Sequence, residues 1–291
     1  MKIERWVHHG PEDRLPNVIA SYPPLNIPSR KKARKLIDEG CCSLNGHIQR
    51  LANSTVCPGD QVEVVIHEEK ELPFDIMYED DSLMVVNKPP GMVVDPKTVI
   101  KALGKKVYLV HRLDKQTSGL FVVAKNVKTQ KYLEERFRKR EVKKGYLALV
   151  DGRVSPSEGV IEKPVMRQDG ESPRFGVHPS GKSATTAFRV VLSSHSASFL
   201  FLRPLTGRTH QLRVHMASLD HPILGDHRYA VQFGCSWRAP RHMLHAWKIA
   251  FVHPEFETEL SWTARIPPDM VSAVKALFGA GFRNKLCALS L

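Results

Sequence analysis

Short apolar segments separated by turn residues dominate this chain and most constrain its fold. They include SLMVV, LFVVA, YLALV, ASFLFL and the late HAWKIAFV. Apolar runs of about four to eight residues between turn signals are typical of buried strands. The strands expected from them outnumber the helices, and most connections are short. The sequence therefore predicts an α+β fold with a mixed, mainly antiparallel sheet over residues 76–270.

A smaller helix-plus-hairpin module is expected before it, over residues 12–70. Ser29 precedes RKKARKLIDEG, which predicts a capped helix that ends near Gly40. Asn45-Gly46 predicts a tight turn between two short strands. The segment HEEKELPFD, charged and interrupted by Pro73, is typical of a linker. Residues 271–291 are expected to form a C-terminal tail with a short helix.

Composition excludes several classes of protein. Charged residues make up 25% and hydrophobic residues 42%, which is an ordinary globular balance. No apolar run reaches the ~18–20 residues of a membrane helix. The N-terminal MKIERWVHHGPEDR has no apolar signal core, and the five cysteines form no CxxC pair. We expect a cytoplasmic protein that has no disulfide framework and binds no membrane.

The net charge of +13 predicts a polyanionic partner, of which nucleic acid is the commonest. Residues 1–70 carry 10 Lys and Arg against 9 Asp and Glu, so the excess lies in the later region. The early module nevertheless holds a local basic cluster, SRKKARK. Its candidate RNA-binding residues are Arg30, Lys31, Arg34 and Lys35.

One carboxylate stands out in the stretch HRLDKQTSGL, between two apolar strands. Asp114 lies there among basic and small polar residues. A carboxylate beside cations stays ionised at neutral pH and can act as a nucleophile or a base. Without any resemblance, however, most lone aspartates of this kind are structural and would cap the loop or pair with Arg112.

A second polar stretch, TGRTHQLRVH, offers Arg208, His210, Gln211 and Arg213 in a few residues. A guanidinium can order a carboxylate or grip a phosphate, although the stretch also fits an ordinary basic start of a helix. His210 and His215 are five residues apart, which misses the spacing of a helical zinc pair. The sequence shows no Walker loop and no GxGxxG motif. No metal and no cofactor are expected.

These stretches together resemble the pseudouridine synthases of the RluA type. The resemblance covers about residues 76–268 and includes YEDDSLMVVNKPPGMVV, HRLDKQTSGL, KKGYLALV, TGRTHQLRVH, HPILGD and RHMLHAWKIAFVHP in the family's order. Asp95-Pro96 departs from the His-Pro of many members. The early module resembles the small alpha-L RNA-binding domain of a small-subunit ribosomal protein.

The resemblance implies a role for each matching residue. Asp114 would be the catalytic aspartate, Tyr146 the tyrosine that stacks against the target base, and Arg213 the cation that pairs with the aspartate. Arg112 would help to displace the base from its stack. Arg208 and His210 would lie near the path of the RNA.

The resemblance also implies the reaction, in which specific uridines of structured RNA become pseudouridine without a cofactor. Asp114 would act by attack on the anomeric carbon or by promoting an elimination, and both routes stay open. Extracting the base costs a few kcal/mol, so RNA loops and bulges are the favoured targets. We expect a monomer that acts on large-subunit (23S) ribosomal RNA. The alternatives are a tRNA substrate, or a non-catalytic RNA-binding or ribosome-assembly protein.

Overall fold

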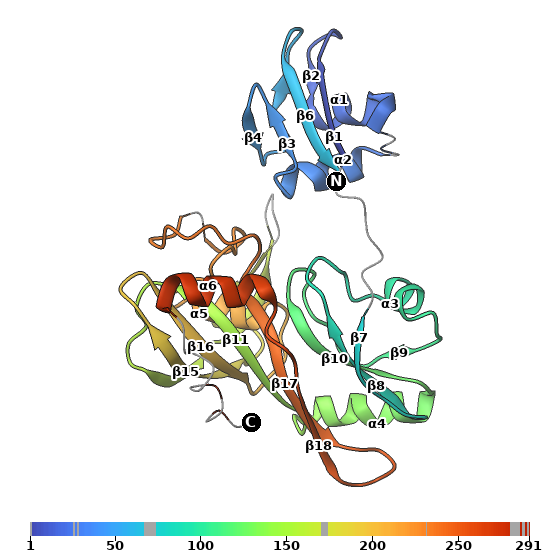
Figure 1. The fold of residues 1–291 in the computed structure, drawn as a ribbon, viewed down its shortest axis with the longest axis vertical. Helices are drawn as coiled ribbons and strands as arrows, with labels where there is room; N and C mark the ends of the chain where they lie inside the picture. The colour runs from blue at the N-terminus through green and yellow to red at the C-terminus, as the bar shows by residue number, and fades with distance from the viewer. Residues whose placement is uncertain are drawn as a thin grey trace. The chain divides into compact units, whose positions relative to one another are not determined.

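The structure is a computed structural model that describes residues 2–25, 27, 29–66, 74–169, 174–230, 232–279, 286, 289 and 291. The chain divides into two compact units, Met1–Glu71 and Leu72–Leu291. Figure 1 shows their fold and labels many of the helices and strands.

The first unit is a four-stranded antiparallel sheet, in the order β1-β6-β3-β4, with two short helices. A core around Leu15, Ile19, Ile37 and Val62 joins the sheet to the helices. The unit begins before residue 12, the start predicted from the sequence, because β1 pairs with β6 along its whole length. The elements are β1 Lys2–Val7, β2 Asp13–Arg14, α1 Leu15–Ser21, the 3-10 helix η1 Pro23–Leu25, α2 Arg30–Asp38, β3 Cys42–Leu44, β4 His47–Gln49, β5 Thr55–Val56 and β6 Gln61–Ile66.

The second unit is built on a ten-stranded sheet. Its main path runs β12-β15-β16-β11-β17-β10-β8-β7, with β18 beside β17 and β9 beside β10. The β10–β17 pair is parallel and the other neighbours are antiparallel, which confirms the predicted fold class. The strands are β7 Asp75–Glu79, β8 Leu83–Lys88, β9 Tyr108–Leu109, β10 Ser118–Ala124, β11 Lys143–Asp151, β12 Glu158–Glu162, β13 Val165–Gln168, β14 Arg174–Val177, β15 Thr185–Ser193, β16 Ala197–Pro204, β17 Leu244–Val252 and β18 Glu259–Thr263. The helices are α3 Pro96–Leu103, α4 Val127–Arg138, α5 Gln211–Ala217 and α6 Pro268–Phe278.

Strands β8 and β10 are continuous apolar runs because both faces of the sheet are covered there. Val85 and Val122 pack with Leu133 of α4 on one face. Alternate residues of the same strands pack with α3 on the other face. Helix α3 begins at Asp95-Pro96, where this chain departs from the His-Pro of many similar sequences. The Asp95 side chain accepts a hydrogen bond from the backbone N–H of Thr98 and so caps the helix.

Helices α5 and α6 contribute to a second core with β11, β15, β16 and β17, and Figure 1 shows both helices beside β11 and β16. Helix α6 supplies the short helix expected near the C-terminus, and it begins at Pro268, before the predicted boundary at residue 271. Met270, Ala273 and Val274 are buried there, because their apolar side chains face the sheet. Most of the remaining predicted tail lies outside the described residues.

Candidate active site

The loop that carries Asp114 connects β9 to β10 and is anchored from beneath by a buried lysine. Lys88 at the end of β8 donates hydrogen bonds from Nζ to the carbonyls of Pro89, Met92 and Lys115, at 2.8, 3.1 and 3.0 Å. Its side chain is fully buried. A buried ammonium with three acceptors is well satisfied, so Lys88 ties this loop to the turn after β8.

Arg213 of α5 holds Asp114 in a chain of three charged groups. Its Nη1 donates to Oδ2 of Asp114 at 2.9 Å. Its Nε and Nη2 donate to the two carboxylate oxygens of Asp226, at 2.6 and 2.8 Å. The bidentate bond to the buried Asp226 fixes the guanidinium plane, and the remaining donor is thereby aimed at Asp114.

These surroundings keep Asp114 ionised. Burial by itself raises the pKa of the Asp114 carboxyl, but His210 and Arg213 beside it bring that pKa below its ordinary value of 3.8. About 22% of the Asp114 side chain stays exposed, so the carboxylate remains accessible to a substrate.

His210 contacts the other oxygen of the same carboxylate. Its Nε2 lies 3.6 Å from Oδ1 of Asp114, and its Nδ1 lies 2.6 Å from the hydroxyl of Tyr229. The Tyr229 ring also lies 4.9 Å from the guanidinium of Arg213. Burial lowers the pKa of His210, which Asp114 partly offsets. His210 adopts φ +55°, a strained backbone held by these contacts.

Hydrogen bonds of the Gln211 side chain hold the loop between β16 and α5 in place. Its Oε1 accepts hydrogen bonds from the Thr206 hydroxyl at 2.7 Å and the Arg208 backbone N–H at 3.0 Å. Its Nε2 donates to the carbonyl of Thr185 at 3.0 Å. The side chain of Arg208 donates to the carbonyl of Ser183. This network sets the loop as one wall of a cavity.

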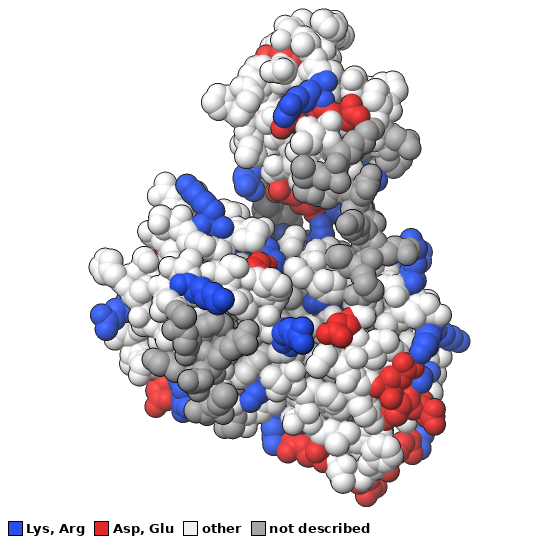
Figure 2. Space-filling view, viewed as in Figure 1, with Lys and Arg blue, Asp and Glu red and all other residues white. Residues whose placement is uncertain are grey.

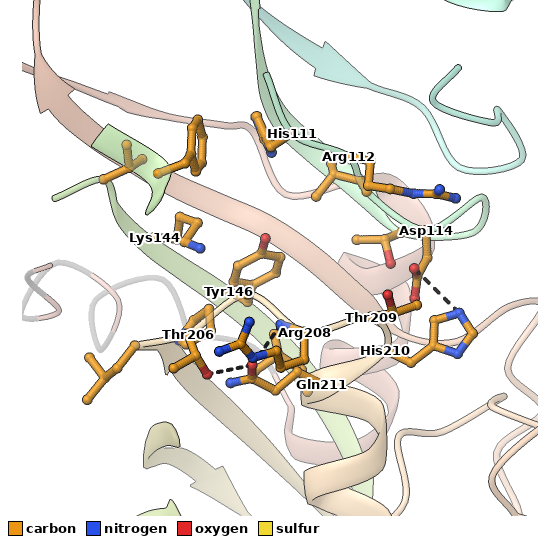
Figure 3. Close-up of a pocket in the computed structure, with 18 of the residues that line it drawn as sticks. His111, Arg112, Asp114, Lys144, Tyr146, Thr206, Arg208, Thr209, His210 and Gln211 are labelled. Carbon is orange, nitrogen blue, oxygen red and sulfur yellow. Dashed lines mark hydrogen bonds and ion pairs between the residues drawn. The ribbon is translucent and has the colours of Figure 1, made fainter. Parts of the chain in front are cut away.

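A cavity of about 890 Å³ opens over these groups (Figure 3). Asp114 is the one carboxylate among its described lining residues. Tyr146 of β11 points into it, and burial, with a further contribution from Asp114, raises the pKa of that phenol. The cationic lining residues are Arg112, Arg138, Arg140, Lys143, Lys144, Arg203, Arg208 and Arg213. The cavity thus offers a single anionic group, an aromatic ring and a basic wall, which suits a nucleotide.

Comparison with known proteins identifies the family of this chain. The family model described as RNA pseudouridylate synthase matches residues 82–218, which include Asp114, Tyr146 and Arg213. A ribosomal large subunit pseudouridine synthase D of Vibrio cholerae is 37% identical over 86% of this chain and 87% of that protein. One of Pasteurella multocida is 34% identical over the same shares.

The chain belongs to the RNA pseudouridylate synthase family. The solved structure of human RNA pseudouridylate synthase domain containing 1 agrees, with a TM-score of 0.60 and 28% identity over 73% of this chain and 97% of that one. Human RNA pseudouridylate synthase domain containing 4 gives 0.58 and 28%, over 69% and 92%. The resemblance to RluA-type synthases is thereby confirmed.

The cavity gathers six of the residues predicted from the sequence: Arg112, Asp114, Tyr146, Arg208, His210 and Arg213. The other four, Arg30, Lys31, Arg34 and Lys35, are exposed on α2 of the first unit. Within the described part of the chain, no three His, Cys, Asp or Glu side chains come together as metal ligands. None of the described helices is long and apolar enough to cross a membrane.

Sequence reasoning missed the groups that hold the site together. Asp226, Tyr229 and Lys88 were not selected, although Asp226 ends the HPILGD motif and Lys88 stands in NKPPG. The motifs showed that these segments matter but did not single out these side chains. Only the fold shows which of these polar side chains turn inward.

Proposed function

We propose that this chain isomerises uridines to pseudouridine in large-subunit ribosomal RNA, with Asp114 as the catalytic carboxylate. The observation that carries the proposal is the single accessible carboxylate of the cavity, held by Arg213 and facing the same space as Tyr146. Membership of the synthase family supports the reaction, and the names of the curated relatives favour the ribosomal substrate. We expect the enzyme to act in the cytoplasm and as a monomer.

Each group of the cavity then has one task. Asp114 attacks the anomeric carbon or promotes elimination, and Arg213 keeps it ionised for either route. Tyr146 stacks against the extracted uracil and assists removal of the proton from carbon five. The exposed Arg112, on the same loop as Asp114, helps to keep the base out of its helical stack. Arg208 and His210 line the path that the RNA takes to the carboxylate.

The deciding experiment uses Asp114→Asn, which keeps the shape of the side chain and removes its charge. We expect no pseudouridine and retained RNA binding, because the reaction loses its nucleophile or base while the cationic wall is intact. The measurement is mapping of pseudouridine by chemical labelling across all cellular RNAs, with the wild type, Asp114→Asn and an exposed control, Asp81→Asn.

Three outcomes would contradict part of this proposal. Product from Asp114→Asn would refute the role of the aspartate. Loss of a site from tRNA instead of ribosomal RNA would refute the substrate. Loss of no site on deletion, with RNA binding retained, would indicate a non-catalytic RNA-binding protein.

We propose further that the first unit is an alpha-L type module that grips the RNA backbone. A cavity of about 430 Å³ lies in this unit, lined by Arg14, Arg30, Arg34, Asn17 and Asn53 among others. Arg14 is held by a 2.9 Å hydrogen bond from Nη1 to the carbonyl of Asn53. Three guanidinium groups around one hollow suit a phosphate. Lys31 and Lys35 on the same helix would add to this attraction.

Arg34→Ala tests this module. We expect weaker RNA binding with unchanged turnover at saturating RNA, because Arg34 lies on the unit that does not carry Asp114. The matched control is Arg5→Ala, which also removes one positive charge from this unit. Arg5 lies on β1 and forms an ion pair with Glu63. Equal affinities of the two variants, measured by filter binding, would refute the module's role.

A further inference from the structure

Lys144 is a cation of the active-site cavity that has no anionic partner in the described part of the chain. The neighbouring Lys143 pairs with Glu259 at 2.7 Å, and Arg213 pairs with two aspartates. The contact of Lys144 is aromatic, with Nζ 5.7 Å from the centre of the Phe137 ring. A cation inside a concave site without a counter-ion suits an anion that the substrate brings.

Lys144 and Tyr146 stand two residues apart on β11, and both side chains line the cavity. Side chains two residues apart on a strand point to the same face of the sheet. In Figure 3, Tyr146 lies between Lys144 and Asp114. Gly207 faces Lys144 from the loop before α5, where an added Cβ would lie 3.7 Å from its Nζ. A base stacked on Tyr146 with its ribose at Asp114 therefore turns its far edge toward Lys144.

The chemistry of the reaction puts negative charge on that edge. When the bond between the ribose C1′ and uracil N1 breaks, its electron pair stays with the uracil and spreads over N1, O2 and O4. Asp114 compensates the ribose for the electron pair that C1′ has lost. It does so either by a bond from the carboxylate to C1′ or by accepting a proton from the ribose. Formation of the C1′–C5 bond uses that electron pair and neutralises the uracil. The C5 proton leaves only afterwards, and a proton added at N1 keeps the product base neutral.

The ring geometry makes one cation sufficient for both halves of the reaction. In the six-membered ring, N1 lies opposite C4, which carries O4, and C5 lies opposite C2, which carries O2. Whether N1 or C5 faces C1′, a charged carbonyl oxygen therefore points away from the ribose. We propose that Lys144 binds this oxygen, O4 before the base rotates and O2 after it, and so stabilises the detached uracil anion. This assignment rests on the proposed function of Asp114.

The surroundings of Lys144 strengthen such an interaction. Burial lowers the pKa of the Lys144 ammonium to about 8, so most of it is still charged at neutral pH. His111 lies close enough to respond to this charge, and burial lowers the pKa of that imidazole to about 3, so His111 stays neutral. A fixed charge in a poorly hydrated site stabilises a developing anion more than the same charge does in water.

The test compares Lys144→Met with Lys128→Met, an exposed lysine outside the cavity that pairs with Glu255, using an RNA that contains the target uridine found by site mapping. We expect Lys144→Met to lower kcat by about 100-fold or more while KM changes little, since the anion exists only during the reaction. Lys144→Arg should recover part of the loss, because it restores the charge. Lys128→Met should keep the wild-type kcat. Thermal melting of each variant confirms that it is folded.

A modified substrate separates charge stabilisation from a structural role. The fluorine of 5-fluorouridine withdraws electrons and stabilises the uracil anion by itself. The ratio of the wild-type to Lys144→Met rates of substrate consumption should therefore be smaller on RNA with 5-fluorouridine at the target position. A misfolded site would lower both rates alike.

Two results would overturn the assignment. Unchanged kcat and KM in Lys144→Met would show that the reaction does not need this cation. A raised KM with unchanged kcat would show that Lys144 only binds the RNA backbone. Failure of the proposed function appears elsewhere, as pseudouridine made by Asp114→Asn or as no product from the wild type.

Discussion

At the scale of single residues, the site depends on one guanidinium that serves two carboxylates. Arg213 donates two hydrogen bonds to Asp226 and one to Asp114, and all three side chains are largely removed from water. Removal of one member of a buried ion network leaves an uncompensated charge, which costs about 3–5 kcal/mol. Asp226 touches no substrate in this scheme. It is a positioning residue that acts through Arg213.

Asp226→Asn should therefore damage both stability and catalysis. An amide accepts at only one of its two terminal atoms, so the bidentate bond is lost and Arg213 is free to turn. We expect a lower Tm, and a kcat reduced by about 10-fold or more with KM nearly unchanged. Calorimetry and single-turnover kinetics measure the two effects. Wild-type kcat in a folded Asp226→Asn enzyme would show that Arg213 needs no such support.

The acid limb of the pH profile should respond to Arg213. The pKa of Asp114 lies below 3.8 because nearby cations outweigh burial, so the ionised form persists until the pH falls through that lowered pKa. Arg213→Gln removes the charge, burial then dominates, and the pKa rises. We expect kcat/KM to begin its fall at a higher pH than in the wild type. An unshifted acid limb, measured over the range in which both enzymes stay folded, would mean that another group keeps Asp114 ionised.

At the scale of secondary structure, the parallel contact between β10 and β17 brings the Asp114 loop to the HMLHA strand. Gly119 pairs with Ala246 at this contact, and a Cβ there would lie 2.1 Å from the Ala246 carbonyl oxygen. Its φ of +111° also disfavours any other residue. The close approach of the two backbones explains why glycine ends the TSG sequence.

Gly119→Ala should separate these strands. We expect a loss of about 3 kcal/mol or more in the free energy of unfolding, from backbone strain and the steric clash together. Gly207→Ala is the matched control, because its added methyl meets only the flexible end of Lys144 at 3.7 Å. Urea denaturation compares the two. Equal stabilities would mean that the strands can move apart at little cost.

At the scale of the whole molecule, the charge is unevenly distributed. Residues 1–70 are nearly neutral, and most of the net +13 belongs to the unit with the cavity. On the face in Figure 2, Lys and Arg are scattered among neutral and acidic side chains. The lining of the cavity is basic, with Asp114 as its one described carboxylate. Positive charge is therefore concentrated at the cavity, which the net charge of the chain does not reveal.

RNA affinity should accordingly fall steeply with salt. If the RNA contacts about 6–10 phosphates, raising the salt from about 50 to 200 mM should weaken binding by about 10³–10⁵-fold, because each contact releases counter-ions. Filter binding over a series of salt concentrations gives the slope. A flat dependence would contradict a site that grips the RNA backbone.

The sequence alone predicted the strands, because apolar runs between turn residues report burial on both faces. It also indicated Asp114, Tyr146 and Arg213, because their motifs are local. It did not show β1 as a strand, since KIERWV has its partner β6 at the far end of the unit. It predicted a short helix near the C-terminus but not that this helix packs on the sheet, since only the tertiary structure shows the burial of Met270, Ala273 and Val274.

Only the tertiary structure decided which polar groups meet. Arg213 lies 99 residues after Asp114, and the choice of Asp226 as its second partner depends on how α5 and the following loop pack against the sheet. Lys143 and Lys144 are adjacent, chemically identical and both line the cavity, yet Lys143 pairs with Glu259 whereas Lys144 has no carboxylate partner among the described residues. Local sequence determines propensity and motif, whereas the pairing of charges depends on distances that exist only after distant segments have packed.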